Sequence, residues 1–445
     1  MAKAKCSIIV YGCSKNQLDA EEMAVRLRQA GFQVVPDPSS ADIVIVHTCG
    51  FIQDAKKESI EGVLMACRMA EEGSGARVLV TGCLSQRYPD ELAKEIPEIS
   101  GVAGTAAPKD IVELVNAALS GERVEAVGVP GRGAPGGEGL RLQDVTGPWS
   151  YLRVSEGCRH RCTYCAIPGI RGPLASRPME EVVAEARLLS SLGVRELNLI
   201  AEDLSDYGYD WDRGRHLPRL LAELAEIEEI MWIRLLYVRP DGVTPELAEA
   251  MAHPKIVPYI DLPIEHGSDK ILRLMGRPGV QDIRRAVSLL RQNVPGLHLR
   301  TTVIAGFPGE TEEDLKETID FLREIGAHRV GVFAYSREEG TPAYLLPDVV
   351  PEELGKERAE RVRRAGLALA KKHSRDMIGS TIPVLLTGPS TRKGYWVGRG
   401  PHQAPEVDGK TYVKVGAMNP APGQIVNAKV RDAAVLDLFA SVRAS

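Results

Sequence analysis

The sequence lacks several features that would narrow its function at once. No apolar run approaches the length of a transmembrane helix, and the N-terminus, MAKAKCSIIVYGCSK, has an apolar run of only four residues, too short for a secretory signal. No GxxxxGK[ST] motif occurs, so nothing indicates the use of ATP. The chain also lacks a large excess of positive or negative charge, because it has 55 basic and 60 acidic side chains and a net charge of only −5. We therefore expect a cytoplasmic protein without a membrane partner, whose thiols stay reduced.

The composition is that of an ordinary globular protein with more than one domain. The chain has 445 residues, 44% of them hydrophobic and 26% charged, which suggests about three domains. The fold class expected is α/β. We predict an N-terminal parallel α/β domain (1–128), a Gly/Pro-rich linker (129–148), a central partial (β/α) barrel (149–375) and a small C-terminal β-barrel of OB-like type (376–445).

Three apolar runs in the N-terminal domain each end in a cysteine. The runs SIIVYGC, DIVIVHTC and RVLVTGC are separated by helical patterns, which predicts a parallel sheet covered by helices. Ligands of such sheets bind beyond the carboxyl ends of the strands, so Cys13, Cys49 and Cys83, here called the strand-end set, could converge on one metal centre. The alternative is that they are small buried hydrophobic side chains. Cys6 and Cys67 lack this placement and are interpreted as structural.

The central domain begins with a second cysteine cluster. Six apolar runs, from YLRVSE to RVGVFAYS, predict the strands of a partial barrel with its chemistry at their C-terminal ends. The loop CRHRCTYC follows the first run and contains Cys158, Cys162 and Cys165, here called the loop set, with no fourth cysteine nearby. Zinc would need a fourth ligand, which His160 could supply. A 4Fe–4S cluster on three cysteines would keep one iron open for another ligand, and the position of the loop favours iron.

The C-terminal domain carries a small positive surplus. From Gly379 onward the sequence has short β-like runs and a charge of +4. The charged residues that give this value are Arg392, Lys393, Arg399, Lys410, Lys414, Lys429, Arg431 and Arg443, against Glu406, Asp408, Asp432 and Asp437. Such a surplus permits contact with RNA, and Tyr395, Trp396 or Tyr412 could stack a base. A solvated surface explains the same charges equally well.

The loop set resembles that of the radical S-adenosylmethionine (SAM) enzymes, in which an aromatic residue, here Tyr164, precedes the last cysteine. This resemblance implies a 4Fe–4S cluster on the loop set, SAM on its open iron, and Tyr164 as a cofactor-binding residue. It also implies that SAM is cleaved to a 5′-deoxyadenosyl radical, which can attack an unactivated C–H bond. The protein would supply position and the exclusion of water.

Nearly the whole chain resembles the methylthiotransferases, which join a three-cysteine α/β domain, a radical SAM barrel and a TRAM module. The resemblance implies a second 4Fe–4S cluster on the strand-end set and an external electron donor. Strings such as GCSKNQLDAEEM, EDLSDYGYD and YIDLPIEHGSDKIL resemble the ribosomal branch, RimO. They imply that the target is the β-carbon of an aspartate in ribosomal protein S-twelve, either free or in the assembling small subunit.

Two alternatives to this function differ in class. The tRNA branch of the methylthiotransferases modifies adenosine, and His266 stands where that branch usually has a serine. The other alternative is a non-catalytic iron–sulfur protein that binds RNA or carries electrons.

Further site residues are expected at the strand ends of the central domain. The GFPGE turn before a helix capped by Thr311 is expected to lie against SAM. Glu202 is expected to bind the cofactor, although the family usually has glutamine there and at Glu265, and asparagine at His47. Arg234, inside an apolar strand pattern, is either a paired core ion or a contact to the cofactor carboxylate. No side chain is assigned as a catalytic group.

Overall fold

The structure is a computed structural model that describes residues 4–130 and 147–442, with only the backbone of Ser74. The chain packs into two compact units. Within the described residues, unit 1 comprises 4–130, 155–181 and 336–344, and unit 2 comprises the rest. This division crosses the predicted domain borders, because the segment with the loop set packs with the N-terminal part. Most of the predicted linker, residues 131–146, lies outside the described residues.

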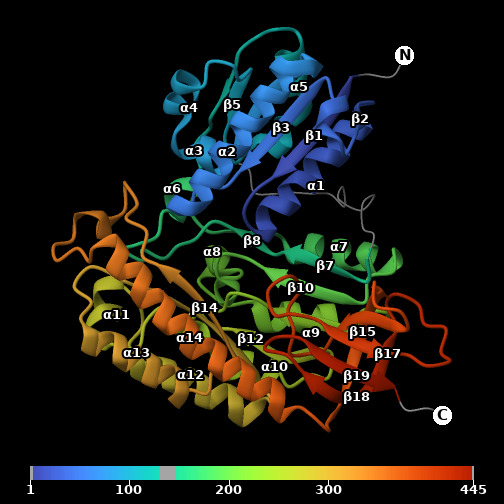
Figure 1. Cartoon of the computed structure of the whole chain (residues 1–445), viewed down its shortest axis with the longest axis vertical. Coiled ribbons are helices and arrows are strands. Elements are labelled where there is room, and N and C mark those ends of the chain that lie inside the picture. The colour runs from blue at the N-terminus through green and yellow to red at the C-terminus, as the bar shows by residue number, and fades with distance from the viewer. Residues whose placement is uncertain (1–3, 131–146, 443–445) are drawn as a thin grey trace. The chain divides into compact units, whose positions relative to one another are not determined.

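Unit 1 is built on a parallel sheet of six strands in the order β2-β1-β3-β4-β5-β6 (Figure 1). The strands are β1 (Lys5–Val10), β2 (Gln33–Val34), β3 (Ile43–Thr48), β4 (Arg77–Gly82), β5 (Gly101–Ala103) and β6 (Val124–Ala126). All neighbouring pairs are parallel. The central strands β3 and β4 are buried on both faces, which is why they read as continuous apolar runs.

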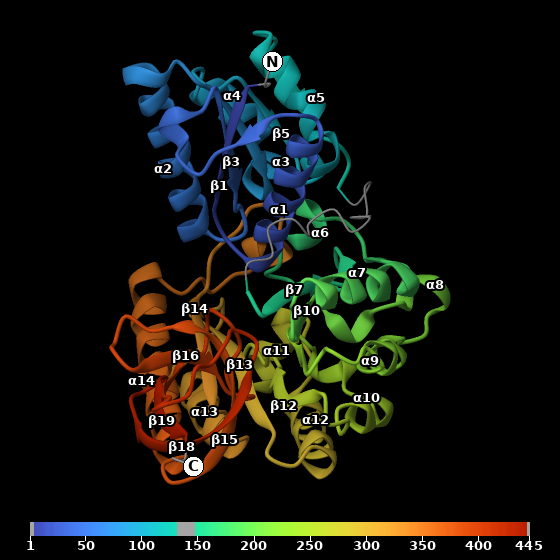
Figure 2. The same cartoon turned by 90° about the vertical axis from the view of Figure 1, so that its right-hand side faces the viewer.

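Helices cover both faces of this sheet, as Figure 2 shows. Helices α1 (Ser14–Gln29) and α5 (Ala107–Leu119) pack on one face, and α2 (Gln53–Met69) and α4 (Pro89–Glu95) on the other. Cys6 lies in the first of these cores and Cys67 in the second, so the prediction that both are structural is confirmed.

The remaining elements of unit 1 are short. They are η1 (Pro38–Ser40), η2 (Ala70–Ser74), α3 (Cys83–Arg87), β8 (Ser155–Glu156), α6 (Ile167–Ile170) and β9 (Ala175–Ser176). Strands β8 and β9 form an antiparallel pair that brackets the loop set in sequence.

Unit 2 contains a second parallel sheet, in the order β14-β13-β12-β11-β10-β7. Its strands are β7 (Trp149–Arg153), β10 (Glu196–Ile200), β11 (Trp232–Leu235), β12 (Ile256–Asp261), β13 (His298–Ala305) and β14 (Arg329–Ala334). The six strands are the six predicted from the apolar runs, and the sheet is open, so the predicted partial barrel is confirmed.

Helices alternate with these strands along the chain, as a parallel sheet requires. They are α7 (Met179–Ser191), η4 (Leu204–Asp206), α8 (Tyr209–Asp212), α9 (Leu217–Ala225), η5 (Pro240–Gly242), α10 (Pro245–Ala250), α11 (Asp269–Met275), α12 (Val280–Asn293), α13 (Glu312–Glu324), η6 (Pro342–Leu345) and α14 (Glu352–Asp376). The long helix α14 packs along β14 (Figure 1). Close packing requires Gly366 there, because a Cβ at that position would lie 2.8 Å from Cβ of Val330.

The C-terminal module of unit 2 is a closed barrel of five strands in the order β15-β16-β17-β19-β18. The strands are β15 (Thr381–Pro389), β16 (Tyr395–Arg399), β17 (Thr411–Lys414), β18 (Ile425–Ala433) and β19 (Leu438–Val442). Val384, Leu386, Val413, Val430 and Ala440 fill its core. The predicted small β-barrel is confirmed. Among the described residues, no helix is long and apolar enough to cross a membrane.

Candidate functional site

The strand-end set lies at the carboxyl ends of three neighbouring strands in unit 1. Cys13 is the N-cap of α1 after β1, Cys49 follows β3, and Cys83 begins α3 after β4. The chain leaves β1 for β2 on one side and reaches β3 on the other, so the crevice between β1 and β3 is a topological switch point, where such sheets bind ligands. The structure thus brings the three cysteines to one edge of the sheet, while their role as metal ligands stays a prediction.

Two glycines allow the strand-end set to close up. Gly12 has a φ of 101°, and a Cβ there would lie 2.7 Å from Cβ of Cys49. Gly82 has a φ of 100°, and a Cβ there would lie 2.7 Å from the carbonyl oxygen of Thr48. Each glycine comes directly before a cysteine of the set, so the backbone of one strand end passes close against the next. Three soft sulfur donors around this narrow cradle fit an iron–sulfur cluster.

Burial controls the protonation of these thiols. It raises the pKa of the Cys83 thiol to about 12, against the opposing effect of the Arg171 guanidinium. Burial also raises the pKa of the Cys49 thiol, and a hydrogen bond from the Phe51 backbone opposes this. Both thiols are therefore protonated at neutral pH. Because thiolate is the ligand form, metal binding at this set must displace protons.

The loop set lies on a loop closed at its base by the β8–β9 pair. The backbone N–H of Cys158 donates to the Gly172 carbonyl at 3.1 Å, and that of Cys165 donates to the Cys162 carbonyl at 3.1 Å. Gly157, with a φ of 67°, must be a glycine, because a Cβ there would lie 2.2 Å from the carbonyl oxygen of Pro173. All three cysteines are partly exposed. The loop therefore presents three partly exposed cysteines on a fixed base, which fits a cluster that must meet a cofactor.

The GFPGE turn at the end of β13 has the predicted cap. Thr311 is the N-cap of α13: its N–H donates to Oδ2 of Asp314 at 2.8 Å, and the Asp314 N–H donates back to Oγ1 of Thr311 at 3.3 Å. Gly306 has a φ of 80°, and a Cβ there would lie 2.6 Å from Cα of Gly355 in α14. The turn is thus fixed between α13 and α14 with its backbone at the mouth of the barrel.

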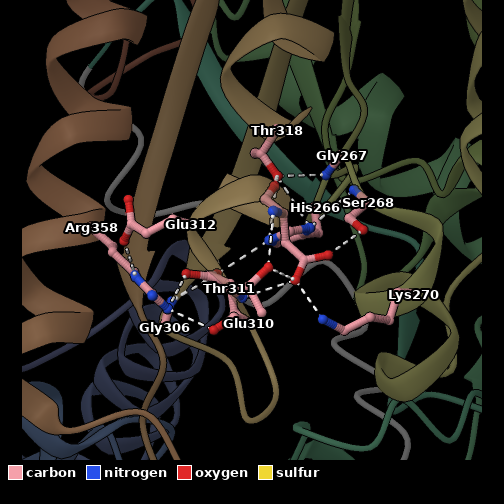
Figure 3. Close-up of polar contacts among 11 residues, drawn as sticks. His266, Gly267, Ser268, Lys270, Gly306, Glu310, Thr311, Glu312, Thr318 and Arg358 are labelled. Carbon is pink, nitrogen blue, oxygen red and sulfur yellow. Dashed lines mark hydrogen bonds and ion pairs between the residues drawn. The ribbon is translucent and has the colours of Figure 1, made fainter. Parts of the chain in front are cut away.

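A buried polar network supports this turn from behind (Figure 3). Oε2 of Glu310 accepts from the Gly306 N–H at 2.9 Å and contacts Nε2 of His266 at 3.2 Å, and its Oε1 accepts from Nη1 of Arg358 at 3.1 Å. The N–H of Ser268 donates to Nδ1 of His266 at 3.0 Å, which leaves the ring proton on Nε2, facing Glu310. Both Glu310 and His266 have fully buried side chains. Three donors therefore converge on one carboxylate that holds the turn.

The three residues predicted to bind the cofactor are placed differently. Tyr164 is half-buried in the loop of unit 1, and Glu202 is half-buried just after β10 in unit 2. Arg234 is completely buried within β11, where Nε donates to Oε1 of Glu196 at 2.9 Å and Nη1 donates to the Pro401 carbonyl at 2.5 Å. This placement favours the paired core ion over the cofactor contact for Arg234. The roles of Tyr164 and Glu202 stay predictions.

The departures from the family pattern have local partners. Glu265 lies 3.6 Å from Nη2 of Arg277, so its charge is balanced inside the protein and adds little negative field. Nδ1 of His47 lies 2.8 Å from Oγ1 of Thr81, and its Nε2 lies 3.5 Å from Oδ2 of Asp19. His47 therefore joins the polar residues behind the strand-end set.

Sequence reasoning missed the side chains that surround the cysteines. Asn16, Asp19 and Arg171 are all buried next to the strand-end set, and Arg171 donates hydrogen bonds to both Asn16 and Asp19. One signal was present, since α1 buries polar residues at three-residue spacing where an amphipathic helix would bury apolar ones. No local pattern could have assigned Arg171 to that helix, because 152 residues separate it from Asp19.

Three family models match successive parts of the chain. They are "Uncharacterized protein family UPF0004" over residues 5–104, "Radical SAM superfamily" over 152–322 and "TRAM domain" over 378–442. Solved structures of similar fold include the radical SAM methyltransferase TsrM from Kitasatospora setae, with a TM-score of 0.56, 16% identity and 77% of each chain covered. The cobalamin-dependent radical enzyme OxsB matches with a TM-score of 0.53 and 14% identity, over 80% of this chain and 56% of that one. At such identities the likeness concerns the fold alone.

Curated relatives match over almost the whole length. The ribosomal protein uS12 methylthiotransferase RimO of Desulforudis audaxviator is 44% identical over 99% of this chain and 97% of its own. The proteins of the same name from Moorella thermoacetica and Geobacter sulfurreducens are 44% and 41% identical, over 96% and 99% of this chain and the same shares of their own. The chain therefore belongs to the RimO family of radical SAM methylthiotransferases.

Proposed function

We propose that this protein transfers a methylthio group to the β-carbon of an aspartate in ribosomal protein uS12, the S-twelve protein of the small subunit. The observation that carries the proposal is the presence of two separate three-cysteine sets in one compact unit, one at a switch point and one on an accessible loop. An electron carrier needs no open iron, so it does not account for sets of only three cysteines, one of them on a partly exposed loop.

Two 4Fe–4S clusters and SAM are the cofactors, with the loop set as ligand of one cluster and the strand-end set as ligand of the other. Bound there, they supply one-electron cleavage of SAM and a sulfur for transfer to carbon. The protein residues orient these groups. The turn from Gly306 to Glu310 offers backbone groups to SAM at the end of β13, and Glu310 keeps that turn in place. The Arg277 guanidinium offsets the charge of Glu265 at the same mouth.

The opposite end of the barrel is closed by buried charges. Glu196, the first residue of β10, binds Arg234 at 2.9 Å and Arg399 of the C-terminal barrel at 2.5 Å, and all three side chains are buried. These contacts pack β10 and β11 against the C-terminal barrel. The C-terminal ends of the strands remain as the side where the aspartate would meet the cofactor.

The C-terminal barrel presents one aromatic and basic face that could contact RNA in an assembling subunit. Tyr412 and Phe439 are paired across β17 and β19 and stack at 5.4 Å, and Arg392 covers the Tyr395 and Phe439 rings at 4.6 and 5.6 Å. Lys414 is exposed two residues after Tyr412, so it lies on the same face. Trp396 packs against the barrel core, so it is not a candidate for stacking a base.

The cellular setting follows from the chemistry of the cysteines. Two clusters that depend on thiolate ligands require a reducing compartment and an electron donor, so we expect the protein to act in the cytoplasm. The uS12 target would be met free or in the assembling small subunit.

Mass spectrometry of uS12 and of tRNA, from cells with and without the gene, tests the function. A mass increase on one uS12 aspartate that disappears with the gene supports the proposal. Loss of methylthioadenosine from tRNA with unchanged uS12 would instead establish the tRNA-modifying alternative. In vitro, reduced and reconstituted protein should release 5′-deoxyadenosine from SAM, which a carrier of electrons would not.

A further inference from the structure

Arg171 is a buried cation that follows the loop set by six residues. Its side chain is 3% exposed, and Nη1 donates to Oε1 of Glu156 at 2.6 Å. Nη2 donates to Oδ1 of Asn16 at 2.7 Å and to Oδ2 of Asp19 at 2.9 Å. Glu156 comes two residues before Cys158, while Asn16 and Asp19 come three and six residues after Cys13. One guanidinium thus joins both flanks of the loop set to the helix that begins at the strand-end set.

Asn16 extends this connection to all three segments of the strand-end set. Its Nδ2 donates to the Tyr11 carbonyl at 2.7 Å, just before Cys13, and to the Thr48 carbonyl at 3.0 Å, just before Cys49. Its Oδ1 lies 3.7 Å from Sγ of Cys83, and this is the same oxygen that accepts from Arg171. The two amide donors fix the orientation of the Asn16 side chain, so Oδ1 must face Arg171 and the sulfur.

The charge of Arg171 is permanent and close to the sulfur atoms. A guanidinium keeps its proton in proteins, and one side-chain oxygen separates Arg171 from Cys83. Burial would lower the pKa of Arg171, but the Glu156 and Asp19 carboxylates raise it well above its usual value. In a water-poor site this cation acts strongly on any charge added to the sulfur atoms.

We propose that Arg171 is a positioning residue for both cysteine sets: it clamps the base of the loop set onto α1 and raises the reduction potential of the cluster on the strand-end set. The inference rests on the proposed assignment of the two clusters to the two sets. A reduced cluster carries one more negative charge than the oxidised cluster, so a fixed cation beside it favours reduction. Asp19, which neutralises part of that cation at 2.9 Å, has the opposite effect.

The test measures the strand-end cluster by itself. The full chain with the loop set replaced by Ala is reconstituted, and the reduced cluster is followed by EPR in a redox titration. At a fixed potential Arg171→Gln should lower the ratio of reduced to oxidised cluster at least tenfold, which is about 59 mV for one electron. Arg171→Lys keeps the charge and should stay within about threefold of the parent. Asp19→Asn should raise the ratio, a shift of opposite sign that loosened packing alone would not produce.

Arg77→Gln is the matched control. Arg77 begins β4, the strand that Cys83 follows, so the same charge is removed about 20 Å away, at the exposed end of that strand. Its ratio should equal that of the parent, because such a distance exceeds the Debye length. Amide exchange of segment 157–172 should increase in Arg171→Gln and remain unchanged in Arg77→Gln.

An unchanged ratio in Arg171→Gln overturns the inference, as does a fall in Asp19→Asn. If Arg171→Gln cannot be loaded with iron, Asp19→Asn and Arg171→Lys decide the question. The proposed function fails separately: a shifted ratio in an enzyme that leaves uS12 unmodified refutes the function and keeps the inference. Normal modification of uS12 with an unshifted ratio supports the proposed function and refutes the inference about Arg171.

Discussion

The Glu310 carboxylate offers a sharp test of how the protein holds SAM. Glu310→Gln keeps the size of the side chain but replaces one acceptor oxygen by a donor NH2. Both oxygens of Glu310 are in use: one faces the Gly306 N–H and His266, and the other faces Arg358. In either orientation of the amide, its NH2 meets at least one donor, so at least one charge-assisted hydrogen bond is lost.

The size of the effect follows from that count. A hydrogen bond to a charged group contributes about 1.5–3 kcal/mol, and a loss of about 2 kcal/mol corresponds to roughly 30-fold. The loss lowers the fraction of enzyme whose turn is ordered, and the apparent affinity falls by the same fraction. We expect the KM for SAM to rise about 10- to 30-fold, with kcat changed less than about threefold. The assay is release of 5′-deoxyadenosine at a series of SAM concentrations.

Glu312→Gln provides the control, two residues after Glu310 at the start of α13. Glu312 also accepts from Arg358, at 3.1 Å, but its side chain is 57% exposed and makes no contact with Gly306 in the described structure. Screening by water limits its contribution to less than about 1 kcal/mol, so KM should rise less than about fivefold. An unchanged KM in a folded Glu310→Gln protein, or an equal rise in both variants, would refute the role given to this network.

Four further results are expected. Replacing the loop set by Ala should remove about half the iron and abolish SAM cleavage. Replacing the strand-end set should remove the other half of the iron but leave the release of 5′-deoxyadenosine intact. Stoichiometric zinc in place of iron would contradict both expectations. Glu196→Gln leaves Arg234 and Arg399 as buried unpaired cations. The free energy of unfolding, measured in urea, should fall by about 3–5 kcal/mol. A loss below about 1 kcal/mol would count against the stabilising role of these buried ion pairs. Burial lowers the pKa of His328 to about 3 and of His373 to about 4. Between pH 7.5 and pH 5.5 the unfolded chain therefore gains protons that the folded chain does not, and the free energy of unfolding should fall by about 1.4 kcal/mol for each histidine. A His373→Gln variant should lose correspondingly less stability over the same pH range. Replacing Arg392 and Lys414 by Ser should weaken RNA binding and reduce the slope of its salt dependence by about 2, with SAM cleavage unchanged, and unaltered binding would exclude that face.

Much of the fold could be predicted because its long strands carry strong local signals. Strands β3, β4, β10 and β11 are buried on both faces, so their runs read as largely apolar instead of alternating. Strands β2, β5 and β6 were missed, since two or three residues carry no periodicity. The last strand of the C-terminal barrel, β19, was missed as well, because its pairing partners β17 and β18 define it more than its own residues do.

The parts of the candidate site that are defined by the spacing of residues in the sequence could be predicted. The parts that depend on contacts between residues far apart in the sequence could not. The loop set is a contiguous motif, and the strand-end set follows from the rule for strand ends. Arg234 was ambiguous, because a charged residue in an apolar strand signals a partner without saying which; the partners are 38 residues away, at Glu196, and in the C-terminal barrel. The docking of residues 155–181 onto the N-terminal sheet left no trace in the βα pattern, which is the same whichever unit a segment joins.

At the strand-end set, a negative charge on Cys83 and the positive charge of Arg171 depend on each other. Placing Cys83 at the start of a helix should favour its thiolate, because helix N-termini carry positive charge. Burial nevertheless dominates at Cys83, whose thiol pKa rises to about 12. A thiolate there needs a positive charge within a few ångströms. The described residues provide Arg171, and the iron of the proposed cluster would provide the rest. Since Arg171 is itself buried, it needs Glu156 and Asp19 in turn. The residues that balance charge at the strand-end set therefore come partly from the segment that carries the loop set, because Glu156 and Arg171 lie on either side of that set.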